Sequence, residues 1–349
     1  MKIPIILSGG KVMAKKKISI KDVAKHAGVG LGTVSRAINN KGSISPKTKA
    51  KVLQSIKELG YTPNRLAQSM RSNKYKNIAF FVDLSNPTFS RIAVGLFNQL
   101  EKHGYTLSLC HIGKENIVNT MESFLSGRLF DGIILAPHRD DDEDLNQYLH
   151  SLDIPIVILE HEIPGFSSGV EIDYYHSVKQ AMAYLFSLGH HQIALLTGSS
   201  HVRSNKSIIK SYMDAYEERN LKPNPDLIMQ GNIADSYHRE AMEKIVEKVA
   251  RKEITALLCM HNQILHLLLD AMKNKQLWFP QDVSLIAVED YELTQLLNPS
   301  VTVIKRSLTS IGEKMADLLI TTINHPNLNP IPPQVIPTQF IIRESCRPL

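Results

Sequence analysis

The residues with the clearest chemical purpose lie on one side of a short predicted helix near the start of the chain. Over residues 31–39 the apolar positions follow the spacing of a buried helix face. The opposite side carries Thr33, Ser35 and Arg36. Hydroxyl groups and a guanidinium bind phosphate oxygens and the edges of bases. The spacing therefore predicts a helix that contacts nucleic acid.

Two further helices would hold that face in place. Apolar residues recur at helical spacing over 20–27, and the turn Gly28-Val29-Gly30 connects this helix to the next. The pair Ser45-Pro46 is typical of a helix start, and Gly60 is typical of a helix end. This order of elements indicates a helix-turn-helix domain, whose second helix lies in the DNA major groove.

The charge distribution sets this segment apart from the rest of the chain. Between Lys11 and Lys76 there are 16 Lys or Arg residues but only two acidic residues, Asp22 and Glu58, a net charge of +14 in a chain whose total is +6. A basic segment on a mildly acidic body indicates a polyanionic partner. The alternative, a solvated basic surface or a localisation tract, is weaker because the charge falls on a helix-turn-helix pattern.

Residues 62–72 form a fourth helical pattern that is too short to be stable alone. It has Pro63 at its first helical position and spans only about ten residues, whereas an isolated helix needs roughly 12 to 15 in water. We expect it to fold in a DNA minor groove beside the same segment of a second copy. There it could insert an apolar side chain between base pairs and bend the duplex.

From residue 77 onward, short β-branched apolar runs alternate with helical patterns of about 12 to 16 residues. This alternation predicts buried parallel strands with crossover helices, arranged as two doubly wound α/β subdomains with a cleft between them. A hydrophobic content of 43% and a charged content of 21% are ordinary for a globular protein of this length.

Several other features argue against particular classes of protein. The three cysteines, Cys110, Cys259 and Cys346, are far apart and form no CxxC, so neither a disulfide framework nor a metal site is predicted. The first twelve residues lack the apolar core of a signal peptide, and no stretch approaches the roughly 18 apolar residues of a membrane helix. We therefore expect a cytoplasmic protein without membrane association, metal or cofactor.

Specific motifs then resemble a known family. The N-terminal segment before residue 77 carries Ile20-Lys-Asp-Val-Ala-Lys-His-Ala-Gly28, Thr33-Val-Ser-Arg36, Lys57-Glu-Leu-Gly-Tyr61 and the segment 63–72. The rest of the chain carries Asp83-Leu-Ser-Asn-Pro87, Asp131-Gly-Ile-Ile-Leu135, Leu188-Gly-His190 and Pro280-Gln-Asp-Val-Ser284. From about residue 18 to 345 the chain is similar to the lactose repressor/galactose repressor (LacI/GalR) family of transcriptional regulators. The resemblance implies a homodimer that binds a palindromic double-stranded DNA operator and a small effector that controls this binding.

The resemblance also implies an organisation into domains. Residues 1–17 would be a disordered extension, 18–62 an all-α helix-turn-helix headpiece, and 63–76 a hinge helix and linker. The core would resemble a periplasmic binding protein, with one α/β subdomain formed by 77–171 and 306–328 and the other by 172–305 and 329–349. In this family the chain crosses between the subdomains three times, here expected near 171–173, 303–306 and 330–334, with the strand Val335 to Ile342 in the second subdomain.

Individual DNA contacts follow from the positions that match the family. Base edges would be read by Leu31, Gly32 and Arg36, and phosphates would be bound by Thr33, Ser35 and Asn39. The minor-groove hinge helix would act through Asn64, Ala67 and Met70. The alternative for Leu31 is packing on the core of the headpiece, and Gly32 has no side chain with which to read a base.

The expected effector cleft departs from the sugar-binding pattern of the family. Where sugar-responsive members carry an Arg, an Asn-Asp pair and an Asp, this chain has Ile208, His261-Asn262 and Glu289. The side chains expected in the cleft, with Arg139 and Arg203 beside them, are Asp83, Asn86, Phe89, His111, His138, His161, Asp173, Lys206, His261, Asn262, Glu289 and Arg306. Because several are cationic or titrate near neutrality, an anionic effector such as a sugar phosphate or a carboxylate is narrowly favoured. A modified neutral sugar and the absence of any small effector remain open.

Two other functions use the same core fold. A solute-binding protein would not need the basic headpiece. A sugar-modifying enzyme would need a nucleophile with a base beside it, and no such pair stands out in the sequence. We therefore predict a DNA-binding regulator and not an enzyme.

Overall fold

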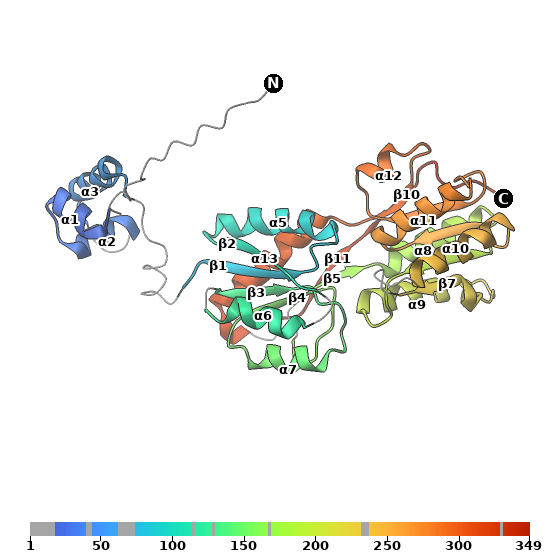
Figure 1. Ribbon diagram of the computed structural model, residues 1–349, viewed down its shortest axis with the longest axis horizontal. Helices are drawn as coiled ribbons and strands as arrows, with labels where there is room; N and C mark the ends of the chain where they lie inside the picture. The colour runs from blue at the N-terminus through green and yellow to red at the C-terminus, as the bar shows by residue number, and fades with distance from the viewer. Residues whose placement is uncertain are drawn as a thin grey trace, which may run out of the picture. The chain divides into compact units, whose positions relative to one another are not determined.

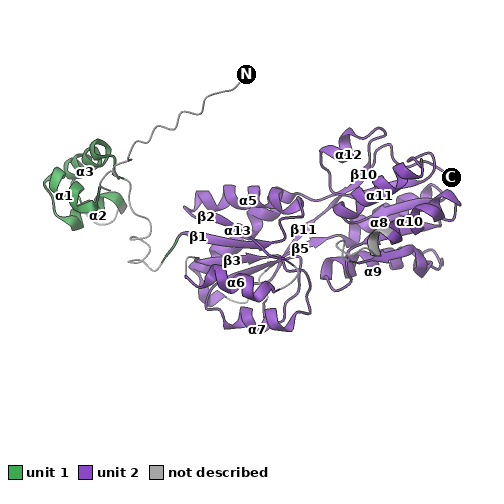
Figure 2. Cartoon of the chain, viewed as in Figure 1, with its two compact units in different colours: residues 1–75 green, residues 76–349 purple. Residues whose placement is uncertain are grey.

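The computed structural model describes residues 18–39, 44–61, 74–113, 116–127, 130–166, 169–231, 237–328 and 331–349. The chain forms two compact units, residues 1–75 and residues 76–349 (Figure 2). The predicted N-terminal extension lies outside the described residues. So do the predicted hinge-helix residues Asn64, Ala67 and Met70.

The first unit is a three-helix domain, as the sequence predicts. Its helices are α1 (Ile20–Ala27), α2 (Leu31–Asn39) and α3 (Pro46–Leu59). Each helix contributes to one small core, which contains Val23, Ala24, Ala27, Val34, Ala37 and Val52. Local signals fix the helix ends. The Ser45 hydroxyl accepts a hydrogen bond from the Thr48 amide at 3.2 Å, and Gly28 and Gly60 adopt left-handed φ values of 60° and 61°.

The second unit contains two six-stranded sheets, and helices cover both faces of each sheet (Figure 1). The first sheet has the order β11-β5-β4-β3-β1-β2. Its strands and the helices packed on it are β1 (Asn77–Val82), α5 (Thr88–Lys102), β2 (Thr106–His111), α6 (Ile117–Leu125), β3 (Gly132–Leu135), α7 (Glu143–Ser151), β4 (Ile156–Leu159), β5 (Gly169–Asp173), α13 (Leu308–Asn324) and β11 (Gln334–Pro337).

The second sheet has the order β12-β10-β9-β8-β6-β7. Its elements are α8 (Tyr175–Ser187), β6 (Ile193–Thr197), α9 (Arg203–Glu217), β7 (Ile228–Gln230), α10 (Tyr237–Ala250), β8 (Ala256–Cys259), α11 (Asn262–Asn274), β9 (Ser284–Val288), α12 (Glu292–Leu296), β10 (Thr302–Lys305) and β12 (Gln339–Ile341), with short 3-10 turns at Pro225–Leu227 and Pro326–Leu328. All described strand pairs are parallel except β10 with β12. Buried parallel strands explain why the sequence shows continuous apolar runs.

The chain crosses between the sheets three times, and the third crossing differs from the prediction. The first two crossings follow β5 and β10, close to the expected positions. The prediction of a third crossing near 330–334 is wrong, because β11 still belongs to the first sheet and only β12 belongs to the second. The run from Val335 to Ile342 is therefore two strands. Pro337 ends the first strand, and the Thr338 hydroxyl lies 2.8 Å from the carbonyl oxygen of Asp173 at the turning point.

Helix α13 begins just after the second crossing and packs unusually close to α5. A Cβ atom added at Gly312 would lie 2.1 Å from the carbonyl oxygen of Ile92, and one added at Gly95 would lie 2.0 Å from that of Thr309. Only glycine permits this backbone approach. The contact fixes the start of α13 and, with it, the residues of the preceding crossing. No helix in the described ranges is both long and apolar enough to span a membrane.

Candidate functional site

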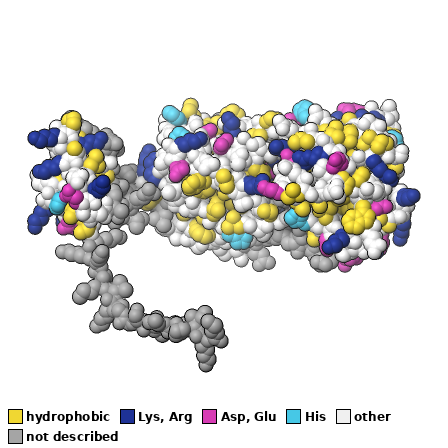
Figure 3. All heavy atoms as spheres, turned by 90° about the horizontal axis from the view of Figure 1, so that it is seen from above, with side chains coloured by type: hydrophobic (Ala, Val, Ile, Leu, Met, Phe, Trp, Pro, Cys, Tyr) yellow, Lys and Arg dark blue, Asp and Glu magenta, His cyan; other side chains and the backbone are white. Residues whose placement is uncertain are grey.

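Helix α2 presents the face that the sequence assigns to DNA. Val34 and Ala37 are buried in the core of the first unit, which turns the remaining positions outward. Arg36 and Gly32 are exposed, and Thr33 and Ser35 are half-buried. Leu31 is 46% exposed and is not part of the core, so the alternative that it only packs internally is not supported. Lys and Arg side chains, dark blue in Figure 3, project from this unit.

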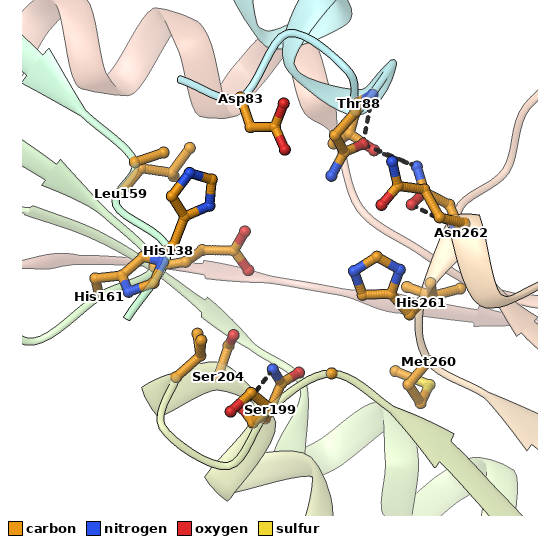
Figure 4. Close-up of a pocket in the computed structure, with 18 of the residues that line it drawn as sticks. Asp83, Thr88, His138, Leu159, His161, Ser199, Ser204, Met260, His261 and Asn262 are labelled. Atoms are coloured by element: carbon orange, nitrogen blue, oxygen red, sulfur yellow. Dashed lines mark hydrogen bonds between the residues drawn. The ribbon is translucent and has the colours of Figure 1, made fainter. Parts of the chain in front are cut away.

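The second unit holds a pocket where the two sheets face each other. It is lined by residues that follow the carboxyl ends of β1, β3 and β4 of the first sheet and of β6, β8 and β10 of the second. In doubly wound α/β proteins, ligands bind at these strand ends, because the connecting loops leave a crevice there. Figure 4 shows Asp83 and His138 on one side of the cavity and His261 and Asn262 on the other.

The pocket brings together eight of the twelve predicted effector residues. These are Asp83, Asn86, Phe89, His138, His161, His261, Asn262 and Arg306. The other four, His111, Asp173, Lys206 and Glu289, do not line it. The carboxylate of Asp173 instead binds His176 Nδ1 at 2.7 Å. Glu289 is buried behind Arg306, and His111 Nδ1 accepts the amide N–H of Leu84 at 3.2 Å.

Several lining residues were missed by the sequence reasoning. They include Thr88, Leu159, Glu160, Tyr174, Ser199, Ser204, Asn205 and Met260. Glu160 directly follows β4, so the rule that sites form at strand ends could have identified it. Asn205 is structural, because its amide group donates to the Ser199 carbonyl at 2.9 Å and shapes the loop after β6.

A cluster of three charges lies at the pocket wall, where Arg306 and Glu160 line the pocket and Glu289 does not. Arg306 Nη1 donates to Glu160 Oε2 at 2.7 Å, and Arg306 Nε donates to Glu289. The Tyr174 hydroxyl donates to the other oxygen of Glu160 at 3.2 Å. The Arg306 side chain is only 10% exposed, and those of Glu160 and Glu289 are 16% and 2% exposed. The single guanidinium is therefore shared by two carboxylates in a largely dehydrated site.

Electrostatics and backbone conformation both show that this cluster is held firmly. Burial alone would lower the pKa of Arg306, but Glu289, Tyr174 and Glu160 together outweigh burial and hold that pKa well above its ordinary value. Burial raises the pKa of Glu289, and Arg306 opposes this. Glu160 and Glu289 have left-handed φ values of 56° and 75°, which non-glycine residues rarely adopt. Such strain is typical of functional sites whose surroundings fix the backbone.

Direct hydrogen bonds join the two sides of the pocket. The Asn262 amide group, at the start of α11, donates to Thr88 Oγ1 at 2.7 Å and to Asn86 Oδ1 at 3.1 Å, both in the first subdomain (Figure 4). Near the loop after β6, the Asp140 amide donates to the His201 carbonyl at 3.2 Å. A ligand between the sheets can therefore change how the two subdomains meet.

The charges of the pocket do not support the anionic effector that the sequence favoured. Arg306 is already neutralised. Arg139 binds Asp141, and Arg203 Nη1 lies 2.9 Å from Glu171. Neither Arg139 nor Arg203 lines the pocket, and Lys206 does not line it either. Among the described lining residues, Arg306 is the only Lys or Arg.

Comparisons with known proteins agree with this architecture. Residues 19–64 match the family "Bacterial regulatory proteins, lacI family", and residues 182–346 match a periplasmic binding protein-like domain. The HTH-type transcriptional repressor PurR of Pasteurella multocida (strain Pm70) is 28% identical over 333 residues, which cover 94% of this chain and 98% of that protein.

Two solved structures share the whole fold. The transcriptional regulator CelR in complex with cellobiose is 25% identical with a TM-score of 0.70, covering 94% of this chain and 99% of that chain. The Lac repressor dimer bound to operator and the anti-inducer ONPF is 22% identical with a TM-score of 0.80, covering 95% and 100%. The three-helix head, the pair of parallel sheets and these matches lead to one conclusion: the chain belongs to the LacI family of bacterial regulatory proteins.

Proposed function

We propose that this LacI-family transcriptional regulator binds a two-fold-symmetric DNA operator as a homodimer. Binding of a small effector in the pocket would lower or raise its affinity for the operator. Its relatives are transcriptional repressors and not enzymes, and the chain is likewise a DNA-binding regulator with a ligand-binding core. The observation that carries the effector part of the proposal is the pocket itself, because its walls come from both subdomains. Operator binding would place the protein in the cytoplasm.

At the DNA, α2 would lie in the major groove. The exposed guanidinium of Arg36 is suited to a bidentate contact with a guanine, and the exposed Leu31 is suited to an apolar contact such as a thymine methyl group. Gly32 would allow close backbone approach. Thr33, Ser35 and Asn39 would bind phosphates and fix the register. Asn64, Ala67 and Met70 of the proposed hinge helix would act in the minor groove between the two half-sites.

The effector would be a polar molecule without a phosphate or carboxylate. Among the described lining residues, the one guanidinium already has two carboxylate partners, so an anion would meet Asp83 and Glu160 with no free Lys or Arg among those residues. Burying an unpaired charge beside like charges is strongly unfavourable. Of the effectors left open by the sequence, the structure therefore supports a hydroxyl-rich non-anionic one.

The DNA part of the proposal can be tested by selecting operators from random duplexes with the full-length protein. We expect palindromic sites, and we expect Arg36→Ala to relax selectivity at one base pair of each half-site by roughly 1–3 kcal/mol. The exposed Lys57→Ala in α3 is the control, and it should weaken all sequences about equally. No preference for palindromes, or an Arg36→Ala effect that is uniform across sequences, would contradict the proposed reading face.

A further inference from the structure

Hydrogen-bond acceptors crowd the side of the pocket formed by the first sheet. Asp83, His138, Glu160 and His161 all line it, from the loops after β1, β3 and β4. In Figure 4, Asp83 and His138 lie on the same side of the cavity, opposite His261 and Asn262. Whether the two histidines donate or accept toward a ligand depends on what their other ring nitrogens bind.

Both histidines are fixed as acceptors toward the pocket when neutral. His138 Nε2 lies 3.1 Å from the carbonyl oxygen of Gly113, and His161 Nδ1 lies 2.6 Å from Asp140 Oδ1. A carbonyl or carboxylate oxygen can only accept, so each of these nitrogens must carry the proton. The remaining nitrogens, His138 Nδ1 and His161 Nε2, then have lone pairs to offer.

Asp83 is the carboxylate of the pocket with the weakest compensation. Its Oδ1 accepts the Ser85 amide at 2.9 Å and lies 3.9 Å from Nδ1 of the half-exposed His111. Within the described ranges, Asp83 Oδ2 accepts no hydrogen bond, and no Lys or Arg nitrogen lies within 4 Å of either oxygen. Its charge is thus available to a ligand.

The charge in and immediately behind the rest of the pocket wall is also negative. Arg306 is outnumbered by Glu160 and Glu289, which share it. Asp140, behind His161, is nine-tenths buried, and its Oδ2 has no hydrogen-bond partner among the described residues. In a site of low dielectric constant, this excess attracts a cation much more strongly than it would in water.

Resting on the proposed function, we propose that the effector is a polyhydroxylated amine, in chemical class an amino sugar. Its ammonium group binds Asp83, and its hydroxyl groups donate to His138 and His161. Phe89, which also lines the pocket, offers an apolar face against which a sugar ring can pack. Such a ligand supplies the donors and the positive charge that the first-sheet side of the pocket lacks.

The test uses the full-length protein and matched probes. Glucosamine, galactosamine and mannosamine carry the ammonium group, their N-acetyl derivatives keep the skeleton without the charge, and the parent hexoses and glucosamine 6-phosphate complete the set. Thermal-shift screening followed by calorimetry should show at least one amino sugar binding about tenfold or more tightly than its N-acetyl derivative, because a charge-assisted hydrogen bond is roughly twice as strong as a neutral one.

Two variants separate charge from shape. Asp83→Asn keeps the size of the side chain but removes its charge, so the preference for the amine over its N-acetyl derivative should disappear. The unliganded variant should melt at the same temperature as the parent or a higher one, which shows that it folds. The control is Asp153→Asn, at an exposed position before β4, which should leave amine binding unchanged.

Each outcome decides the question. The proposal is overturned if a neutral hexose or the phosphate binds more tightly than every amine, if Asp83→Asn retains the preference, or if none of the probes binds. Operator binding is measured on the same preparations without any probe. A protein that selects an operator but shows no preference for amines refutes this inference alone, whereas a protein that selects no operator refutes the proposed function.

Discussion

Replacing Arg306 with Met should strongly destabilise the second unit. The substitution keeps most of the side-chain volume but leaves Glu160 and Glu289 facing each other without a cation, and the Glu289 side chain is only 2% exposed. Removing one partner of a buried ion pair costs about 3–5 kcal/mol. For a domain of this size, 1 kcal/mol corresponds to about 2–4 °C, so the melting temperature should fall by roughly 6–20 °C.

The pH dependence of that loss gives a sharper test. Burial already raises the pKa of Glu289, and removing Arg306 raises it further. A carboxyl group whose pKa is higher in the folded than in the unfolded protein stabilises the fold below its unfolded pKa, and this contribution is lost as the pH rises through the folded pKa. The variant should therefore lose more stability relative to the parent at pH 8 than at pH 5.5.

Denaturant unfolding of the parent and the variant at several pH values measures both effects. Arg91→Met is the matched control, because Arg91 also pairs with a carboxylate, Glu292, but their side chains are 45% and 74% exposed. Exposed pairs contribute only about 0–1 kcal/mol. Adding Glu289→Gln to Arg306→Met should recover part of the loss. If Arg306→Met costs no more than Arg91→Met, or costs the same at both pH values, the reasoning about a shared buried guanidinium is wrong.

Two further predictions concern stability. Gly312→Ala should destabilise the protein by about 1–3 kcal/mol, since its Cβ would lie 2.1 Å from the Ile92 carbonyl oxygen, whereas Gly113→Ala, with open space around its Cβ, should be nearly neutral in thermal unfolding. Burial lowers the pKa of His190, so only the unfolded chain takes up a proton as the pH falls below about 6.5, and stability should decline there. His190→Gln should reduce that decline in denaturant titrations between pH 5.5 and 7.5. An unchanged slope would show that His190 is not the group responsible.

Much of the fold could be predicted because the local signals agree with one another. Ser45-Pro46 and Gly60 mark the ends of α3, and the continuous apolar runs correctly indicate buried parallel strands. The third crossing was misplaced because Val335 to Ile342 reads as one strand by periodicity. Only the pairing partners, Ile172 for Ile336 and Ile304 for Phe340, show that its halves belong to different sheets.

The residues that line the pocket were harder to predict, because whether a side chain faces the pocket depends on what its polar atoms already bind. Sequence position suggested that Glu289 would face a ligand, yet its carboxylate faces Arg306 and is almost fully buried. Lys206 lies on α9 but does not line the pocket. Glu160 was missed because no family position pointed to it, although its carboxylate lies 2.7 Å from Arg306 Nη1.

The three departures from the sugar-binding pattern of the family have a common electrostatic consequence. At the position of the usual Arg, Ile208 lines the pocket but is only 2% exposed and carries no charge. At the position of the Asp in the usual Asn-Asp pair, Asn262 donates its amide protons to Asn86 and Thr88. The carboxylate at Glu289 is retained, but it binds Arg306. The pocket therefore lacks the usual Arg, and Arg306 is already paired with carboxylates. Asp83 still offers its negative charge to a ligand, and His138 and His161 each still offer a nitrogen lone pair. A ligand that meets these groups must bring its own donors, and a positive charge would add to its affinity.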